Sequence, residues 1–407
     1  MSQAAHILGA SRPSYVRVVA AVCAAHFVAH YFIILLAPLM PFVRAEYGVS
    51  YTAIGFAFVA FNIVSATLQT PAGFLVDRFG ARPLLVAGLI ISSVAFITAG
   101  LVDSFWVLIA MFALAGVGNT VFHPADYSLL SQHVPSERIG QAFSVHTFAG
   151  MLGSAVAPAS LLIMQSQWGW RGAFIGASAL GIVVAAVLLA IRDFSAIRTS
   201  SALATRQNAD SSAAGWQLLL SAPIVLNLVF FVLLAMISAG LYNYSVVALG
   251  ALYATPVPTA NVALSGNLLL SAIGVLIGGL LVGRTTRHGL VAAVGLGAMA
   301  LFTTLIGEIE FGPVVLISAM SLIGFFSGII MPSRDMIVRD VTPPGSFGKV
   351  FGFVTTGFNI GGIIAPLMFG YVMDAGHPRA VFFLVSGLAL VAILTIIPSF
   401  VRRRAAI

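Results

Sequence analysis

The amino-acid sequence predicts an all-α membrane protein whose twelve transmembrane helices form two pseudo-symmetric halves of six helices each. Of its 407 residues, 60% are hydrophobic and only 8% are charged, which is far more apolar than the core of a soluble protein requires. Apolar runs of about 20 residues or more recur along the chain, and this is the length at which a helix spans a bilayer. One long polar segment separates six such runs from six others.

An internal repeat supports the arrangement in two halves. The stretch from Gly116 to Asp126 returns in outline 208 residues later as Gly324 to Arg334, and the match continues without a gap. Most of the paired positions hold glycine or proline, such as Pro124 with Pro332. Because these residues set how helices bend and pack, the two halves are expected to be built alike.

The predicted spans follow the apolar runs in order, with their ends placed to within a few residues. They cover about 17–43, 51–76, 83–101, 105–131, 138–164, 172–191, 217–250, 261–283, 289–308, 312–338, 347–373 and 379–400. The segment between the sixth and seventh spans is rich in Ser, Ala, Arg and Asn, which is typical of a connector. The predicted domains are therefore residues 1–191, a linker at 192–216 and residues 217–407.

The orientation follows from the basic residues, because cytoplasmic loops retain Lys and Arg during insertion. With the N-terminus inside, all but three of the 19 Lys and Arg residues lie on the inner side, and the exceptions are Arg44, Arg171 and Arg379. The first apolar run is too long for a signal-peptide core and lacks a small-residue cleavage site, so we expect it to be retained. The sequence predicts a multi-pass protein of the cell inner membrane with both termini cytoplasmic.

Several classes of function are disfavoured by the sequence. The formal charge of +7 comes from residues that stand singly between apolar runs, which indicates topology rather than nucleic-acid binding. The single cysteine, Cys23, offers no disulfide framework. The sequence contains no P-loop, nucleophile elbow or HExxH motif, so we expect neither ATP-driven transport nor an enzyme, and no cofactor. No metal site is expected because no histidine stands in a compact ligand motif, although several histidines with Asp126 could act as ligands.

The loop between the second and third spans carries a signature that reads Gly73-Phe-Leu-Val-Asp77-Arg78-Phe-Gly80-Ala-Arg82. It resembles the GxxxDRxGxR motif of the major facilitator superfamily, and the resemblance covers essentially the whole chain. It implies the major facilitator fold and a cytoplasmic latch in which Asp77 meets the N-terminus of the eleventh helix, a contact that the helix dipole favours. In the degraded second copy Gly283 replaces the Asp, which implies an asymmetric latch. The alternative is that Asp77 and Arg78 are solvated loop charges.

Within that superfamily, the chain is most similar to the fosmidomycin-resistance-like branch of exporters. The resemblance is carried by His26, Pro38, Leu39, Gln69, Pro71 and above all Gly118-Asn-Thr-Val-Phe-His123-Pro124. His30 stands where that branch tends to place an acidic residue, and Ala125 followed by Asp126 stands where it has Glu. The residues that couple protons are therefore expected to be arranged differently here.

Helices five and eleven carry matching small residues and prolines, Gly153 with Pro158 and Gly361 with Pro366. They resemble the fifth-helix motif associated with antiporters, although Ala precedes the proline in both copies. Small residues let helices approach closely and proline bends a helix, which suits a gate. Ordinary helix packing would explain the same residues.

Polar residues inside a membrane are costly, and each is a candidate for function. His26 and His30 are four residues apart on one face of the first helix, and Asn119, His123 and Asp126 form a stripe on the fourth. In this superfamily helices one, four, seven and ten line the central path, so both groups are expected to face it, together with Tyr242, Asn243 and Arg334. His146 on the fifth helix is a weaker candidate.

Histidine titrates near physiological pH and responds to a neighbouring carboxylate, so these residues can bind and release protons as water access alternates. For His123 the alternative is a hydrogen bond to a helix carbonyl at the Pro124 break. The repeat sets Asp126 opposite Arg334, and the two could pair when the inner gate closes, or each could reach the headgroups separately.

The predicted function is secondary active transport by alternating access, with proton-coupled export of a small, anionic or amphiphilic compound. The alternative is proton-coupled uptake of a small organic anion, with Arg334 or Arg339 attracting it. A non-transporting membrane receptor would have less reason to keep the intramembrane His and Asp residues. The expected partners are a small-molecule substrate, protons and the lipid bilayer, without nucleic acid, and the protein is expected to be a monomer.

Overall fold

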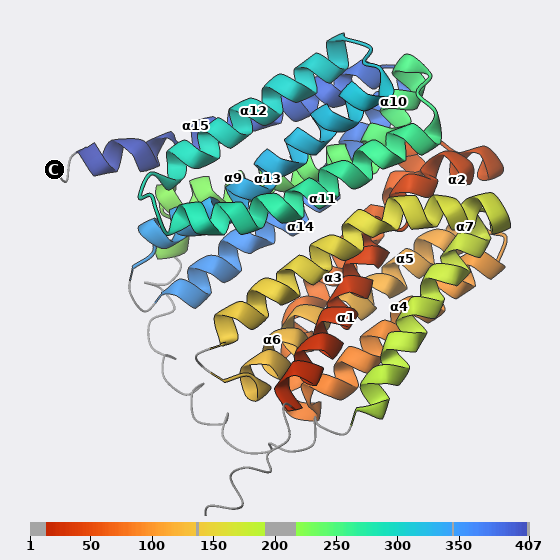
Figure 1. Cartoon of the computed structure of the whole chain (residues 1–407), viewed down its shortest axis with the longest axis horizontal. Helices are drawn as coiled ribbons and strands as arrows, with labels where there is room; N and C mark the ends of the chain where they lie inside the picture. Colours follow the sequence, from red (N-terminus) through yellow and green to blue (C-terminus); the bar gives the residue numbers. More distant parts are fainter. Residues whose placement is uncertain (1–13, 136–137, 192–216, 344–345, 405–407) are drawn as a thin grey trace, which may run out of the picture.

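The computed structural model describes residues 14–135, 138–191, 217–343 and 346–404. Within these ranges every regular element is a helix, and the helices form two bundles that lie side by side (Figure 1). The predicted all-α fold with two halves is thereby confirmed. The predicted linker at 192–216 lies outside the described residues.

The N-terminal bundle begins with a helix that is interrupted near Pro38, a residue that cannot donate to the preceding turn. Gly80 has a φ of 92°, a conformation that favours glycine, and it makes the one-residue turn between the second and third long helices. The elements are α1 (Ser14–Ile34), η1 (Ala37–Leu39), α2 (Met40–Tyr47), α3 (Tyr51–Phe79), α4 (Ala81–Leu101), α5 (Phe105–Asn119), α6 (Phe122–His133) and α7 (Ile139–Ala190).

The last of these, α7, is two membrane helices joined by a tight bend. Its 52 residues would be about 78 Å long as a straight helix, which is more than twice the hydrocarbon thickness of about 30 Å. The backbone leaves the helical conformation at Gly169, where φ is 69°. By length and composition, eleven helices of the described residues could cross a membrane. Because α7 folds back at Gly169, they supply the twelve predicted crossings.

The C-terminal bundle contains one irregular element, a π-helical turn within its first long helix. The elements are α9 (Ala222–Ala239), the π turn η3 (Gly240–Tyr244), α10 (Ser245–Tyr253), α11 (Val257–Val282), α12 (His288–Glu308), α13 (Pro313–Val341), α14 (Phe347–Asp374) and α15 (Pro378–Arg404). These bounds agree with the predicted spans to within a few residues at most ends.

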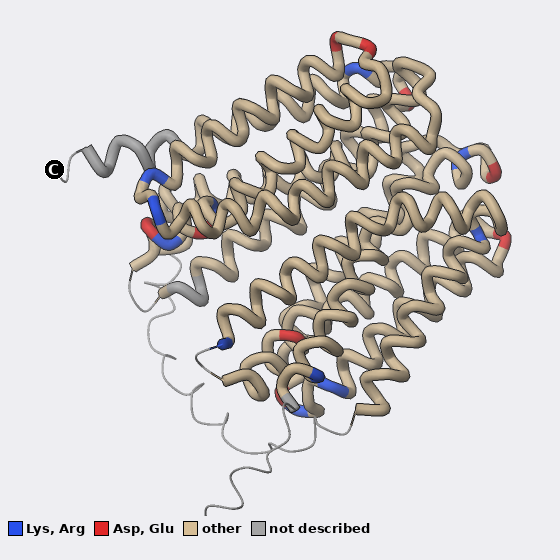
Figure 2. The backbone as a smooth tube through the Cα atoms, in the orientation of Figure 1, with Lys and Arg blue, Asp and Glu red and all other residues tan. Residues whose placement is uncertain are grey.

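Charged residues gather at the two ends of the bundles and leave an apolar band between them, as a membrane-spanning protein requires (Figure 2). We name each end after one residue that lies there, Asp77 or Asp374. From the element bounds, the Asp77 end also carries Arg138 and Arg339, and the Asp374 end carries Glu46, Arg171 and Arg379.

The two halves meet at the Asp374 end, where α14 packs on α3. The Asp374 carboxylate accepts hydrogen bonds from the backbone N–H groups of Tyr51 (2.7 Å) and Thr52 (2.8 Å), at the N-terminus of α3. The backbones are so close here that a Cβ on Gly370 would lie 2.7 Å from Cα of Thr52. At the Asp77 end the halves separate (Figure 1), and Asp77 is exposed. This conformation is closed at the Asp374 end.

Candidate functional site

A buried carboxylate lies at the centre of the N-terminal half. Asp126 has no exposed surface, and among the acidic residues that the structure describes it is the only buried one. Its Oδ2 is 3.1 Å from Nδ1 of His26 and 3.0 Å from Nε2 of His146, so one oxygen is held by two imidazoles. Its Oδ1 has no hydrogen-bond partner among the described residues.

Four imidazoles surround this carboxylate. The rings of His26 and His146 are stacked with their centroids 3.7 Å apart, and those of His30 and His123 lie 4.6 Å and 5.5 Å from the His26 ring. We refer to these four histidines and Asp126 as the histidine cluster. Its members come from α1, α6 and α7, so the cluster ties three helices of one half together.

The local sequence makes room for these rings. A Cβ on Gly150 would lie 2.5 Å from Cδ2 of His26 and 2.9 Å from Cδ2 of His30, so α7 needs glycine at this position. The helix is broken between α5 and α6, just before Pro124, because the ring nitrogen of Pro124 cannot donate to the carbonyl of Thr120.

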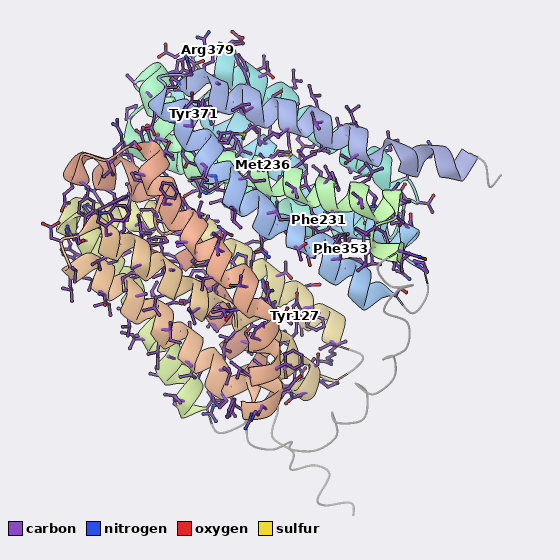
Figure 3. The ribbon with its side chains drawn as sticks, turned by 180° about the vertical axis from the view of Figure 1, so that it is seen from behind. Tyr127, Phe231, Met236, Phe353, Tyr371 and Arg379 are labelled. Atoms are coloured by element: carbon purple, nitrogen blue, oxygen red, sulfur yellow. The ribbon has the colours of Figure 1, made fainter. Side chains whose placement is uncertain are left out.

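The cluster reaches from the protein interior to the space between the halves. His26 and His146 are buried, whereas His123 is exposed. The His123 ring stacks on Tyr127 at 6.1 Å, and Tyr127, which is 47% exposed, lies on the side of its half that faces Phe231 and Phe353 (Figure 3). His123 is therefore the exposed member of the cluster, and Asp126 is buried behind it.

The side chains of His26, Asp126 and His146 could hold either a proton or a divalent metal ion. Ligand atoms of His26, Asp126 and His146 all lie within 4.8 Å of one another, and two imidazoles with a carboxylate can hold a divalent transition metal. The N···O separations of 3.0 and 3.1 Å are hydrogen-bond lengths, and two ligand atoms that each lie about 2.0–2.2 Å from one metal ion are also roughly 3.0–3.5 Å apart. The geometry therefore suits either a shared proton or a metal ion.

The structure brings together four of the predicted residues, His26, His30, His123 and Asp126. Their partner His146 was only a weaker candidate in the sequence, yet it makes one of the two hydrogen bonds to Asp126. A signal was present, because His146, Gly150 and Gly153 fall at i, i+4 and i+7 on one face of α7.

Other predicted residues lie apart from the cluster. Asn119 donates from Nδ2 to Oγ of Ser65 at 2.8 Å and so links α5 to α3, because the interruption before Pro124 separates it from the stripe of His123 and Asp126. Tyr242 and Asn243 lie half-buried in the π turn of the other half.

Arg334 and Asp126 are not paired in this conformation. Arg334 donates from Nε to Oδ1 of Asp335 at 2.9 Å, and Asp126 is enclosed by histidines of its own half. The pairing inferred from the repeat therefore stays a prediction for a conformation closed at the Asp77 end.

The signature residues act within their own half. Arg82 donates from Nε and Nη2 to the carbonyl oxygens of Leu188 and Leu189, the last turn of α7, whose carbonyls lack helix partners. Arg78 lies over the ring of Phe79 at 5.3 Å. Gly73 has open space where a Cβ would be. The latch expected of Asp77 stays a prediction, since the halves are separate at this end.

The matched glycines of helices five and eleven, which belong to α7 and α14, let neighbouring helices pack closely. A Cβ on Gly153 would lie 2.1 Å from the carbonyl oxygen of Phe27 on α1, and one on Gly361 would lie 2.5 Å from that of Val232 on α9. Pro366 lies within α14, and its carbonyl oxygen accepts a hydrogen bond from the Tyr244 hydroxyl at 2.6 Å. Bending at Pro158 and Pro366 stays a prediction.

Comparison with known proteins gives concordant matches along the whole chain. The sequence profile of the Major Facilitator Superfamily matches residues 22–257 and 228–406. The chain is 25% identical over 401 residues to a "Probable sulfoacetate transporter" of Cupriavidus necator, covering 90% of this chain and 89% of that protein. It is 25% identical over 368 residues to the fosmidomycin resistance protein of Escherichia coli, covering 89% and 87%. The crystal structure of a nucleoside transporter has the same fold, with a TM-score of 0.76 at 14% identity over 94% of this chain and 98% of that one.

Proposed function

The chain belongs to the major facilitator superfamily, and from this premise we propose that it is a proton-coupled secondary transporter that exports a small compound by alternating access. Members of this family are multi-pass membrane transporters. The coupling ion, the direction of transport and the residues responsible for proton coupling are proposals.

The observation that carries the proposal is the burial of Asp126 between two imidazoles. An ionised carboxylate away from water is costly unless a cation accompanies it. With His26 and His146 neutral the cluster holds one negative charge, and a single added proton makes it neutral. The cluster therefore has a strong physical reason to take up one proton whenever water reaches it.

The arrangement of the rings supports a route for that proton. His123 is exposed, its ring lies 5.5 Å from that of His26, and His26 is hydrogen-bonded to Asp126. We propose that His123 collects the proton from the space between the halves and that His26 relays it to Asp126. The tautomers of these rings can then reverse with each transfer.

Protonation is coupled to movement through the helices that the cluster joins. Asp126 Oδ2 accepts from α1 and from α7 at once, and adding a proton changes which of these two hydrogen bonds can form. Because α7 also packs against α11 of the other half, a change of packing here reaches the contact between the halves. Rocking of one half against the other about a central site is how such two-half transporters alternate access.

The proposed orientation places the Asp77 end in the cytoplasm, with both termini cytoplasmic in the cell inner membrane, as the distribution of Lys and Arg favours. Residues 1–191 and 217–407 act as the moving units with 192–216 as linker. One chain supplies the whole cluster, which supports function as a monomer. In this orientation the structure has the inward-open state, in which an exporter loads its substrate.

Export is favoured by the similarity to a protein named for fosmidomycin resistance. The second candidate is uptake of a small organic anion with a proton, which the similarity to a sulfoacetate transporter favours. Arg334 on the opposite half offers a positive charge for such an anion.

The test uses inverted membrane vesicles whose interior is made acidic and reports that acidity with a fluorescent dye. Fosmidomycin and sulfoacetate serve as probes. For proton-coupled export we expect the transported probe to accumulate inside and the interior to lose acidity. The Asp126→Asn variant should do neither. Accumulation that requires an alkaline interior would establish the uptake alternative, and accumulation without proton movement would refute proton coupling.

A further inference from the structure

A second charged site lies on the C-terminal half, where Arg334 is held between two aromatic rings. Its guanidinium carbon is 4.7 Å from the ring centroid of Phe231 and 5.1 Å from that of Phe358. Stacking on an aromatic face suits the planar guanidinium and fixes its orientation. An arginine that only reached for the lipid headgroups would extend into water, whereas this side chain is 13% exposed.

Asp335 occupies only one edge of the guanidinium. A single oxygen, Oδ1 of Asp335, accepts from Nε at 2.9 Å and lies 2.8 Å from Nη2 of Arg334. Arginine has five N–H donors in a planar fork. Among the described residues none accepts from Nη1, so the edge formed by Nη1 and the rest of Nη2 is available. That edge matches the two oxygens of a carboxylate, sulfonate or phosphonate.

Arg334 lies close to the region where the two halves face each other. Phe231, which stacks on Arg334, lies opposite Tyr127 of the other half (Figure 3). Asp335 acts electrostatically on the Tyr127 hydroxyl across the same space. Tyr127 in turn stacks on His123, the exposed member of the histidine cluster. An anion on Arg334 would therefore lie on the path between the halves, facing the proposed entry point for protons.

We propose that Arg334 is the recognition site for the acidic group of the substrate, and that the transported compound is a small organic acid. This inference rests on the proposed transport function but not on its direction or on proton coupling. The half-exposed Asp335 carboxylate competes for the same cation, which keeps the binding of the acid weak enough for release after each cycle. Substrate and proton would then bind to different halves, Arg334 holding the acid and the histidine cluster the proton.

The experiment measures binding to the purified full-length protein in detergent by thermal stabilisation, without any proton gradient. The probes are sulfoacetate, fosmidomycin and galactonate, with neutral galactose as the matched compound without an acid. At least one acid should stabilise the wild-type protein, and galactose should not. For Arg334→Gln we expect the required concentration of acid to rise roughly 10- to 100-fold, because a charge-assisted pair of hydrogen bonds is lost.

Two variants separate recognition from folding and from general charge. Arg284→Gln removes the same charge from an exposed position of the same half and should bind the acid as the wild type does. Arg334→Lys keeps the charge but loses the fork, and should bind with intermediate affinity. Equal affinity in wild type and in a folded Arg334→Gln, or no stabilisation by any of the acids, would overturn the proposal. Either result would leave proton coupling to be judged by the vesicle experiment alone.

Discussion

At the scale of single residues, the proposed proton coupling depends on one buried carboxylate and the four histidines around it. Asp126 is costly to keep in a membrane, and its two hydrogen bonds to His26 and His146 offset part of that cost. The remaining oxygen, Oδ1, is without a partner among the described residues. A site with one unsatisfied acceptor is well suited to gain a proton.

The first prediction concerns the titration of this site. Asp126→Asn keeps the shape of the side chain but cannot take up a proton, so gradient-driven accumulation should fall to background while exchange of substrate across the membrane continues. Uptake and exchange of a labelled probe in proteoliposomes at several pH values would measure both. His377→Gln, in an exposed loop at the Asp374 end, is the matched control and should keep the wild-type pH profile.

The same assay distinguishes a proton from a metal. If the cluster works with protons, prolonged treatment with a chelator should leave transport unchanged, and the purified protein should contain less than one equivalent of transition metal. Loss of transport on chelation, with recovery on adding Zn²⁺, would show that His26, Asp126 and His146 act as metal ligands instead.

The second prediction tests the space that α7 leaves for the rings. In Gly150→Ala the new Cβ would meet the imidazoles of His26 and His30, and it should destabilise the protein by about 1–3 kcal/mol, as overpacking does. Gly279→Ala is the control, because a Cβ there meets nothing within 4 Å. Melting temperatures in detergent would compare them. Equal stability of the two variants would mean that the rings can move aside.

At the scale of helices, the pair formed by α3 and α14 has one carboxylate at each of its ends, Asp374 at one and Asp77 at the other. Asp374 at the end of α14 caps the N-terminus of α3 through the N–H groups of Tyr51 and Thr52. Asp77 lies at the other end of α3 and, by resemblance to the family signature, is expected to meet the start of α14. An anion at a helix N-terminus is stabilised by the unpaired N–H groups and the helix dipole. We therefore expect Asp374 and Asp77 each to favour closure of the end of the helix pair at which it lies.

The third prediction is that these two residues act on the conformational equilibrium with opposite sign. Asp374→Asn weakens the contact at the Asp374 end and should favour molecules open there, whereas Asp77→Asn should favour molecules open at the Asp77 end. Spin labels on cysteines introduced at Ser131 and Arg339, in a Cys23→Ser background, would report the separation of the halves at the Asp77 end.

We expect the distance between these labels to shorten in Asp374→Asn and to lengthen or stay long in Asp77→Asn. The wild-type protein with the same labels is the reference. A shift in the same direction for both variants would contradict the idea of two opposing latches.

At the scale of the whole molecule, the two proposed sites lie on separate bundles. The histidine cluster lies entirely in the N-terminal half and Arg334 in the C-terminal half, while the contact between the halves is made by α3 with α14 and by α7 with α11. Each half has its own close helix contacts, such as Gly153 of α7 against α1 and Gly361 of α14 against α9. Such halves can move against each other without losing their internal packing.

The fourth prediction follows from this separation. If residues 192–216 only connect the halves, then two fragments divided within that segment and expressed together should assemble and transport, since the contacts between the halves come from the helices. Copurification of one fragment with the other and transport in vesicles would test this. Assembly of both fragments without transport would assign the linker a role in the cycle itself.

The sequence by itself determined the number, order and approximate ends of the helices, because the hydrocarbon thickness imposes a fixed length of apolar residues on each crossing. Through its 208-residue repeat it also determined the division into two similar halves. It identified His26, His30, His123 and Asp126 for a related reason, since any ionisable residue inside an apolar run stands out.

Only the tertiary structure decided how these residues meet. Whether His146 faces Asp126, and whether Asn119 turns instead to Ser65, depends on the rotation of one helix against another and on the interruption before Pro124. In a membrane both faces of a helix can be apolar, so hydrophobic periodicity does not fix that rotation. The close approach at Gly150 and the stacking of Arg334 between two rings arise from contacts among residues distant in the chain, and packing of that kind is set only when all the helices are in place.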